Sequence, residues 1–96
     1  AMCPHTWSAA LRSAGAGCLA VDLVMGREIQ NAFCAVRPPG HHAERSSAMG
    51  FCFFNNIAVA AAHALAVHGL ERVAIIDFDV HHGNGTEDIF KGNDKV

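Results

Sequence analysis

The longest apolar pattern in the chain lies near its beginning and predicts a helix over Thr6–Met25. This stretch is rich in Ala, Leu and Val, and Gly26 follows it at a position where helices commonly end. Gly15 and Gly17 weaken an isolated helix, so we expect a neighbouring element to pack closely against them. The expected buried face contains four apolar residues that fall near one side of the helix: Leu11, Cys18, Val21 and Met25.

A second helix is predicted over residues 57–68, where alanine dominates the sequence. Asn55 or Asn56 can cap its beginning, because an asparagine side chain accepts a hydrogen bond from the first free backbone N–H groups. Gly69 can end it, since glycine adopts the left-handed backbone conformation without strain.

Two short runs are apolar at nearly every position, residues 32–36 and residues 73–80, and the second is also rich in β-branched side chains. Continuous apolar runs of this length are typical of strands that are covered on both faces. The order of helix, strand, helix and strand predicts an α/β fold with a parallel sheet and right-handed crossovers. In such sheets ligands bind beyond the carboxyl ends of the strands, and the sequence places two histidine pairs there, His41-His42 and His81-His82.

The composition allows one domain, with no internal boundary in residues 1–96. Hydrophobic residues make up 51% of the chain and charged residues only 17%, so a thin core would leave apolar surface uncovered. Residues 91–96 provide no closing cap or helix, which is typical of a chain cut within a fold. We therefore expect either a homo-oligomer or a piece of a larger domain.

The charge pattern argues against two classes of partner. A net charge of −2 and a pI near 6.4 leave no basic surface for nucleic acid or for an anionic membrane. No stretch is expected to reach the length of a membrane span, and the first residues lack the regions of a signal peptide. The cysteines form no C-x-x-C pair, so we expect reduced, buried thiols in an intracellular, cytoplasmic protein: Cys3, Cys18, Cys34 and Cys52.

The second predicted strand carries a candidate metal site. Asp77, Asp79 and His81 alternate along it and so project from one side, with neighbouring Cα atoms about 6.5 to 7 Å apart. Asp79 and His81 can then converge on one cation, and a carboxylate with an imidazole suits zinc, whose catalytic sites use three protein ligands and keep one position open. The alternative interpretation is a strand end at which His81 forms an ordinary ion pair.

The first histidine pair is a candidate for proton transfer. His41 and His42 follow two prolines that stiffen the loop, and Gly40 allows the backbone to turn so that both rings face a cleft. One of them can act as a general base near neutral pH. Asp77 is the natural partner to fix the tautomer of that ring. The alternative interpretation places all the paired histidines on surface loops.

Three of the six phenylalanines follow this loop. We expect Phe53 and Phe54 to fill the core, and Phe51, next to Gly50, to line an apolar access channel. Four histidines receive a structural role or none: His5, His63, His68 and His82.

Three motifs resemble those of the zinc-dependent histone deacetylase superfamily, which includes acetylpolyamine amidohydrolases and bacterial deacetylase-like amidohydrolases. They match in order and separation: RPPGHHAE at residues 37–44, GFCFFNN at 50–56 and DFDVHHGNG at 77–85. The RPPGHH form and Asn84 resemble the class II branch. The resemblance implies that residues 1–96 are a central, partial segment of a catalytic domain with an arginase-like, three-layer α/β fold. It also implies hydrolysis of the N-acetyl amide of a lysine or a polyamine.

The resemblance implies a role for each matched residue. Asp79 and His81 correspond to zinc ligands. His41 and His42 correspond to the tandem histidines that handle protons and stabilise charge, and we expect His42 to be the general base and His41 to act electrostatically.

The other matched positions support these groups. Asp77 corresponds to the acid behind His41, whereas Asn84 stands where class I members carry an acid behind His42, so this second pair is neutral. Gly50 and Phe51 correspond to the acyl channel, with the Gly50 carbonyl expected to meet the substrate amide. Two potassium sites are also implied, the first at Asp77 with the carbonyls of Asp79 and His81, the second at the carbonyls of Phe90, Asn93 and Val96.

Two departures from the family pattern limit what these residues can do alone. The third zinc ligand, an aspartate, and a later tyrosine or histidine that stabilises the oxyanion lie further along in the family, and this chain contains no tyrosine. We therefore expect little or no activity from the isolated 96 residues.

Two other functions stay open: a non-catalytic module that binds a partner or an acyl ligand, and an arginase-like di-metal ureohydrolase. The latter would need an acid at Gly83.

Overall fold

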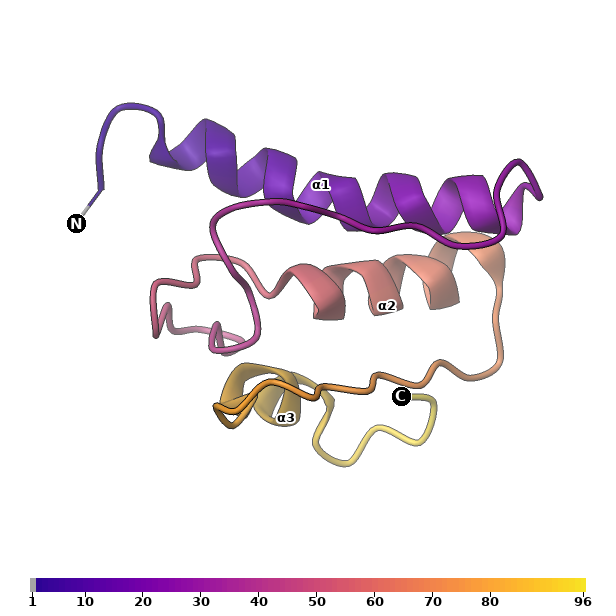
Figure 1. Ribbon diagram of the computed structural model, residues 1–96. Helices are drawn as coiled ribbons and strands as arrows, with labels where there is room; N and C mark the ends of the chain where they lie inside the picture. Colours follow the sequence, from indigo (N-terminus) through magenta and orange to yellow (C-terminus); the bar gives the residue numbers. More distant parts are fainter. Residues whose placement is uncertain (1) are drawn as a thin grey trace.

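The computed structural model describes residues 2–96 and contains three helices, α1 over Thr6–Met25, α2 over Asn56–His68 and α3 over Asn84–Phe90. Helices α1 and α2 pack along each other, and the short α3 contacts α2 (Figure 1). Extended segments and turns connect the helices. The first two helices are the ones predicted from the sequence, whereas α3 was not predicted as a distinct element.

The capping residues of the two long helices are those the sequence indicated. Gly26 ends α1, and its N–H donates to the Asp22 carbonyl over 2.8 Å. Asn55, rather than Asn56, caps α2, because its side-chain oxygen accepts the N–H of Ala58. Gly69 ends α2 in the left-handed conformation, with a φ of 64°.

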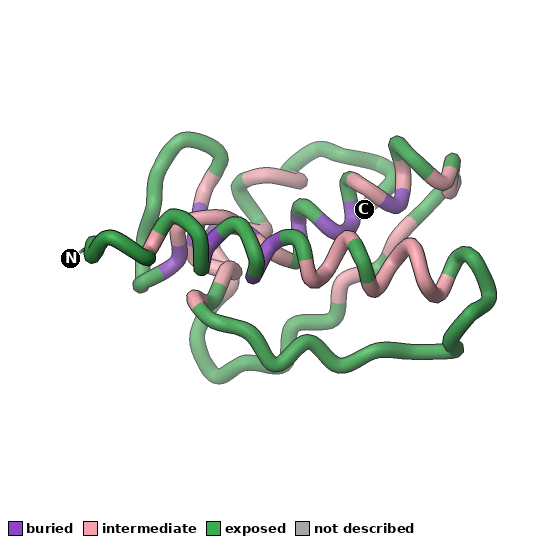
Figure 2. Tube along the Cα trace, turned by 90° about the horizontal axis from the view of Figure 1, so that it is seen from above, coloured by how far each residue is buried: buried purple, intermediate pink, exposed green. Residues whose placement is uncertain are grey.

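Small residues form the core between α1 and α2 (Figure 2). A Cβ atom at Gly17 would lie 3.1 Å from that of Ala60, so the predicted close approach is confirmed at this glycine. It is wrong at Gly15, which has no neighbour within 4 Å. The predicted apolar face is wrong at Leu11 and Met25, which are exposed, whereas Cys18 and Val21 are half-buried. The buried residues on the two helices are Ala10, Ser13, Ala14, Ala58, Ala60, Ala61 and Ala64.

The two predicted strands do not form among the described residues. Residues 32–36 and 73–80 run as separate extended segments (Figure 1), and neither has a strand beside it. A strand needs a neighbouring backbone to complete its hydrogen-bond ladder, and here the only backbone bond to these segments joins the Val73 N–H to the Lys95 carbonyl. Large apolar side chains on these segments are therefore exposed to solvent: Phe33 is 92% exposed and Phe78 is 95% exposed.

The cysteine and membrane expectations need correction. All four cysteines are free thiols, but Cys3 and Cys34 are exposed and only Cys52 is buried.

Helix α1 is long and apolar enough to cross a membrane by length and composition, so the expectation that no stretch reaches this length is wrong. Core helices share these properties, and α1 packs along α2 while carrying the polar groups of Ser13 and Asp22 toward it.

Replacing Asn55 with alanine should destabilise the fold by about 1 to 3 kcal/mol, because it removes a helix cap and unpairs a buried carbonyl. The Asn55 amide is buried, and it donates to the Ala43 carbonyl at 3.2 Å and to the Thr86 hydroxyl at 3.1 Å. Urea-induced unfolding of the protein that contains this chain would measure the loss. The matched variant Asn55→Ser keeps a side-chain oxygen for the cap without burying a charge and should lose less; equal losses would contradict the role of the cap.

Candidate active site

The loop that carries His41 and His42 is fixed to both long helices at its beginning. The Ser13 hydroxyl, on α1, donates to the Pro38 carbonyl over 2.8 Å. The Asn56 amide, on α2, donates to the same carbonyl at 3.1 Å and to the Ser13 hydroxyl at 2.9 Å. Next to it, a Cβ atom at Gly40 would lie only 2.5 Å from the Asn56 nitrogen, so the loop passes this close to α2 because glycine has no side chain.

Helix α3 fixes the other side of the same loop. The N–H of Gly85 donates to the His41 carbonyl over 2.9 Å. Arg45 joins α3 twice, through its N–H to the Asp88 carboxylate and through its guanidinium to the Ile89 carbonyl, both at 2.9 Å. The residues that follow the second histidine pair therefore hold the first pair in place.

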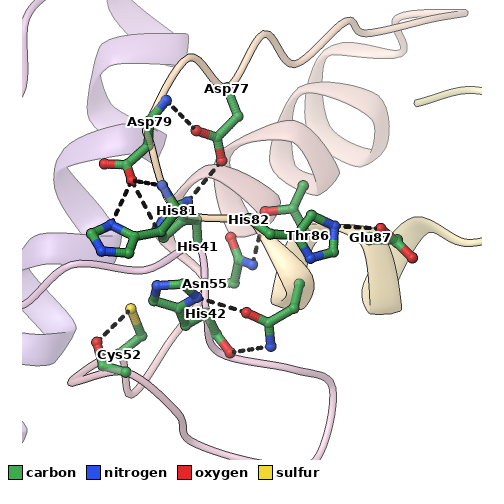
Figure 3. A network of polar contacts seen from close by, with 12 residues as sticks. His41, His42, Cys52, Asn55, Asp77, Asp79, His81, His82, Thr86 and Glu87 are labelled. Carbon is green, nitrogen blue, oxygen red and sulfur yellow. Dashed lines mark hydrogen bonds and ion pairs between the residues drawn. The ribbon is translucent and has the colours of Figure 1, made fainter.

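His41 is oriented by a carboxylate from the extended segment. Its Nδ1–H donates to Asp77 Oδ2 over 2.8 Å, and its Nε2 lies 4.0 Å from Asp79 Oδ1 (Figure 3). The hydrogen bond from His41 lowers the pKa of the Asp77 carboxyl below its ordinary value of 3.8, and the Asp79 backbone N–H adds to this effect. Asp77 is therefore ionised and can accept hydrogen bonds only.

His42 is oriented by an amide instead. Its Nδ1–H donates to Asn84 Oδ1 over 2.6 Å. The Asn84 amide donates in turn to Glu44 Oε2 at 3.2 Å and to the His42 carbonyl at 3.4 Å, so its oxygen faces the imidazole. The sequence interpretation gave Glu44 no role, although its position two residues after the histidine pair was the available signal.

Asp79 and His81 lie together at the exposed edge of the site (Figure 3). Asp79 Oδ1 lies 2.9 Å from His81 Nδ1, and it also accepts the His81 backbone N–H at 2.7 Å. The backbone hydrogen bond from His81, followed by the side-chain bond, lowers the pKa of the Asp79 carboxyl. Asp77 likewise accepts the Asp79 N–H at 3.1 Å. These two-residue turns, rather than the predicted strand pleat, bring the groups to one side.

These groups fit two positions of a zinc site. A carboxylate oxygen and an imidazole nitrogen 2.9 Å apart can both reach one ion, since zinc takes such ligands at about 2.0 to 2.2 Å. The side chains of Asp79 and His81 are 49% and 70% exposed, so an ion can approach them from solvent. Among residues 2–96, no third metal-binding side chain joins them within one coordination sphere.

Three histidine rings lie close together in the site, tilted or edge-on to one another. The ring centres of His41 and His42 are 4.2 Å apart, and those of His42 and His81 are 6.0 Å apart. His82 lies outside this group, because it is exposed and its Nε2 bonds to Glu87 Oε2 at 2.6 Å. The implied second potassium site involves a turn in which the Phe90 carbonyl accepts the Asn93 N–H.

The residues expected to line an acyl channel adopt the left-handed backbone conformation, which strains Phe51 but not Gly50. Gly50 and Phe51 both have positive φ angles, 55° and 66°. A Cβ atom at Gly50 would overlap the His42 imidazole, so this glycine leaves room for the ring. Phe51 is 88% exposed and closes no channel among the described residues. Phe54 packs edge-on against the Trp7 ring, with centroids 5.5 Å apart, and is only half-buried.

The chain belongs to the histone deacetylase domain family, because the model of this family matches residues 1–96. It is 50% identical over 93 residues to the polyamine deacetylase HDAC10 of Homo sapiens, covering 97% of this chain and 14% of that protein. It is 53% identical over 93 residues to the histone deacetylase-like amidohydrolase of Pseudomonas aeruginosa, covering 97% and 24%. The chain thus spans less than a quarter of these relatives.

A solved structure gives the same assignment. The crystal structure of the HDA15 HD domain matches with a TM-score of 0.87 and 48% sequence identity, over 91% of this chain and 24% of that one. The path of the three helices and the extended segments is therefore that of a histone deacetylase domain, although the described residues themselves contain no strand.

Replacing Gly50 with alanine should cost about 2 to 5 kcal/mol, because strain from the positive φ adds to overlap with His42. Gly69→Ala is the matched control. Gly69 has a φ of 64° but nothing within 4 Å, so only the backbone strain of about 1 to 2 kcal/mol should appear. Chemical unfolding of both variants would measure the difference, and equal costs would show that His42 does not restrict this position.

The contribution of Asp77 to stability should depend on pH in the acidic range. Its folded-state pKa is lowered, so the ionised group stabilises the fold above 3.8 and this contribution disappears as the pH falls through the lowered value. The difference in unfolding free energy between wild type and Asp77→Asn should therefore be fully present above pH 3.8 and shrink as the pH falls below it. A difference independent of pH would contradict the ion pair.

Proposed function

We propose that the protein containing this chain is a zinc-dependent amidohydrolase that removes acetyl groups from lysine or polyamine amines. The observation that carries this proposal is the arrangement of two imidazoles, each held at Nδ1 by its own partner, beside the Asp79 and His81 pair. The relatives are named as a polyamine deacetylase and a histone deacetylase-like amidohydrolase, which agrees with this substrate class.

The two imidazoles would have different catalytic roles, because one is bonded to a carboxylate and the other to an amide. His42 donates a hydrogen bond from Nδ1–H to a neutral amide oxygen, which leaves Nε2 with a free lone pair that can take a proton from the attacking water. His41 donates to a carboxylate, which stabilises positive charge on its ring. We therefore assign His42 as the general base, which then returns the proton to the leaving amine, and His41 as the electrostatic group.

Asp79 Oδ1 and His81 Nδ1 would hold the metal, with the neutral His81 ring carrying its proton on Nε2 instead. Zinc bound there would supply polarisation of the acetyl carbonyl and activation of water at neutral pH. The third ligand and the oxyanion donor would come from outside these residues, as the family resemblance implies. We also propose potassium near Asp77, Asp79 and His81, and near the carbonyls of Phe90, Asn93 and Val96.

The extended segments fit the same proposal. We propose that residues 32–36 and 73–80 become strands of an arginase-like parallel sheet when neighbouring strands of the whole domain pair with them. Exposed side chains such as Phe33 and Phe78 would then be covered. The relatives include a chloroplastic protein, so we propose an intracellular location without a compartment.

A di-metal ureohydrolase is disfavoured by one contact. A Cβ atom at Gly83 would lie 2.6 Å from Asp77 Oδ2, so the further acid that such a site needs has no room at this position.

His42→Ala in the protein that contains this chain should lower deacetylation of an acetylated lysine or polyamine by about 10² to 10⁴-fold, because the general base is lost. Bound zinc, measured by elemental analysis, should stay unchanged. His82→Ala is the matched control and should keep normal turnover, since His82 bonds only to Glu87 at the surface. Normal turnover by the His42 variant would contradict its role, and loss of zinc would assign His42 to the metal site instead.

A further inference from the structure

A second group of metal-binding side chains lies where α1 and α2 end side by side. Asp22 is in the last turn of α1, and His63 and His68 are in the last turns of α2. This place lies about 18 Å along the α2 axis from the amino end that holds the histidine loop. Nothing in the proposed deacetylase site uses these residues.

Both imidazoles converge on one carboxylate oxygen. Asp22 Oδ1 accepts the Nε2–H of His63 at 2.6 Å and the Nε2–H of His68 at 2.7 Å. The possible ligand atoms of all three side chains lie within 4.8 Å of one another. The two rings meet at a steep angle, with centroids 5.7 Å apart, so their nitrogens point to a common position from different directions.

The surroundings hold the imidazoles and leave the carboxylate open. The side chains of His63 and His68 are 23% and 22% exposed, whereas that of Asp22 is 46% exposed. Because the rings are already restricted by the two helices, an ion would not have to order them on binding. The exposed side of Asp22 leaves a path for an ion and for a water ligand.

We infer that Asp22, His63 and His68 form a binding site for a divalent transition metal ion such as Zn²⁺, separate from Asp79 and His81. Two imidazole nitrogens and one carboxylate oxygen are a ligand set that this class of ion prefers. With bonds of about 2.0 to 2.2 Å in a tetrahedral arrangement, ligand atoms lie about 3.3 Å apart. The present contacts need to open by less than about 1 Å to admit the ion.

The protonation states allow this exchange. Hydrogen bonds from His68 and then His63 lower the pKa of the Asp22 carboxyl, so it is ionised and ready to bind at neutral pH. To bind the ion through Nε2, each imidazole would carry its proton on Nδ1 instead, so the ring changes tautomer through solvent and stays neutral. The neighbouring Cys18 thiol has a pKa raised by burial and by the Asp22 charge, so it stays protonated and is not part of the ligand set.

The competing explanation is that the triad only clamps α1 to α2 by hydrogen bonds. Asp22→Asn separates the two, because the asparagine oxygen still accepts one of the imidazole N–H bonds while the negative charge that binds a cation is gone. His5→Ala is a control for simple loss of a histidine, since His5 makes no side-chain capping bond.

The test is a zinc titration by calorimetry on the metal-free protein that contains this chain, in the background variant D79N/H81A. This background removes two ligands of the proposed deacetylase site, so the result does not depend on the proposed function. We expect one zinc ion to bind, with His5→Ala unchanged and Asp22→Asn weaker by at least about tenfold. Cobalt bound in its place should show tetrahedral visible absorption that His63→Gln abolishes.

The inference is overturned if the background variant takes up no zinc at micromolar concentration, or if Asp22→Asn and His63→Gln bind zinc as the background does. In either case the triad is a helix clamp. Circular dichroism of each variant confirms that the helices persist, and should Asp22→Asn fail to fold, His63→Gln provides the same comparison with the carboxylate retained.

Discussion

The close approach of α1 and α2 fixes the start of the histidine loop around which the candidate site is built. The buried side chains between the helices are small, and a Cβ atom at Gly17 would already crowd Ala60. At this separation Ser13 and Asn56 reach the same Pro38 carbonyl, one from each helix. Larger side chains in the contact would separate these groups, and the histidine loop would lose its fixed starting point. The contact between the helices therefore both forms the core and positions the histidine loop.

The two long helices were predictable because their signals are local. Asn55, Gly26 and Gly69 act on backbone groups within a few residues, so the sequence suffices to place them. The strands were not predictable in the same way. The apolar run at residues 73–80 carries the side chains of a strand, but the hydrogen-bond partner that makes it one is a different segment. Periodicity describes what a segment can bury and says nothing of what is beside it.

The candidate site shows the same division. The motifs singled out residues that lie together in the structure, where His41 contacts Asp77 and His42 contacts Asn84. The motifs could not show which contacts hold these groups. Two-residue turns, rather than a strand pleat, gather the acidic residues, and Glu44 fixes the Asn84 amide. The grouping of Asp22 with two helix histidines was equally invisible, because 41 and 46 residues separate the partners.

The amide behind His42 has a consequence for how the site tolerates acid. Asn84 has no proton to gain in the range where enzymes work, so its oxygen accepts from Nδ1 whether the rest of the site is acidified or not. Asp77, behind His41, is an acid and loses its charge when it is protonated. The two neighbouring rings therefore differ in what anchors them. His42 is anchored by a group that does not itself titrate, and His41 by a group that does.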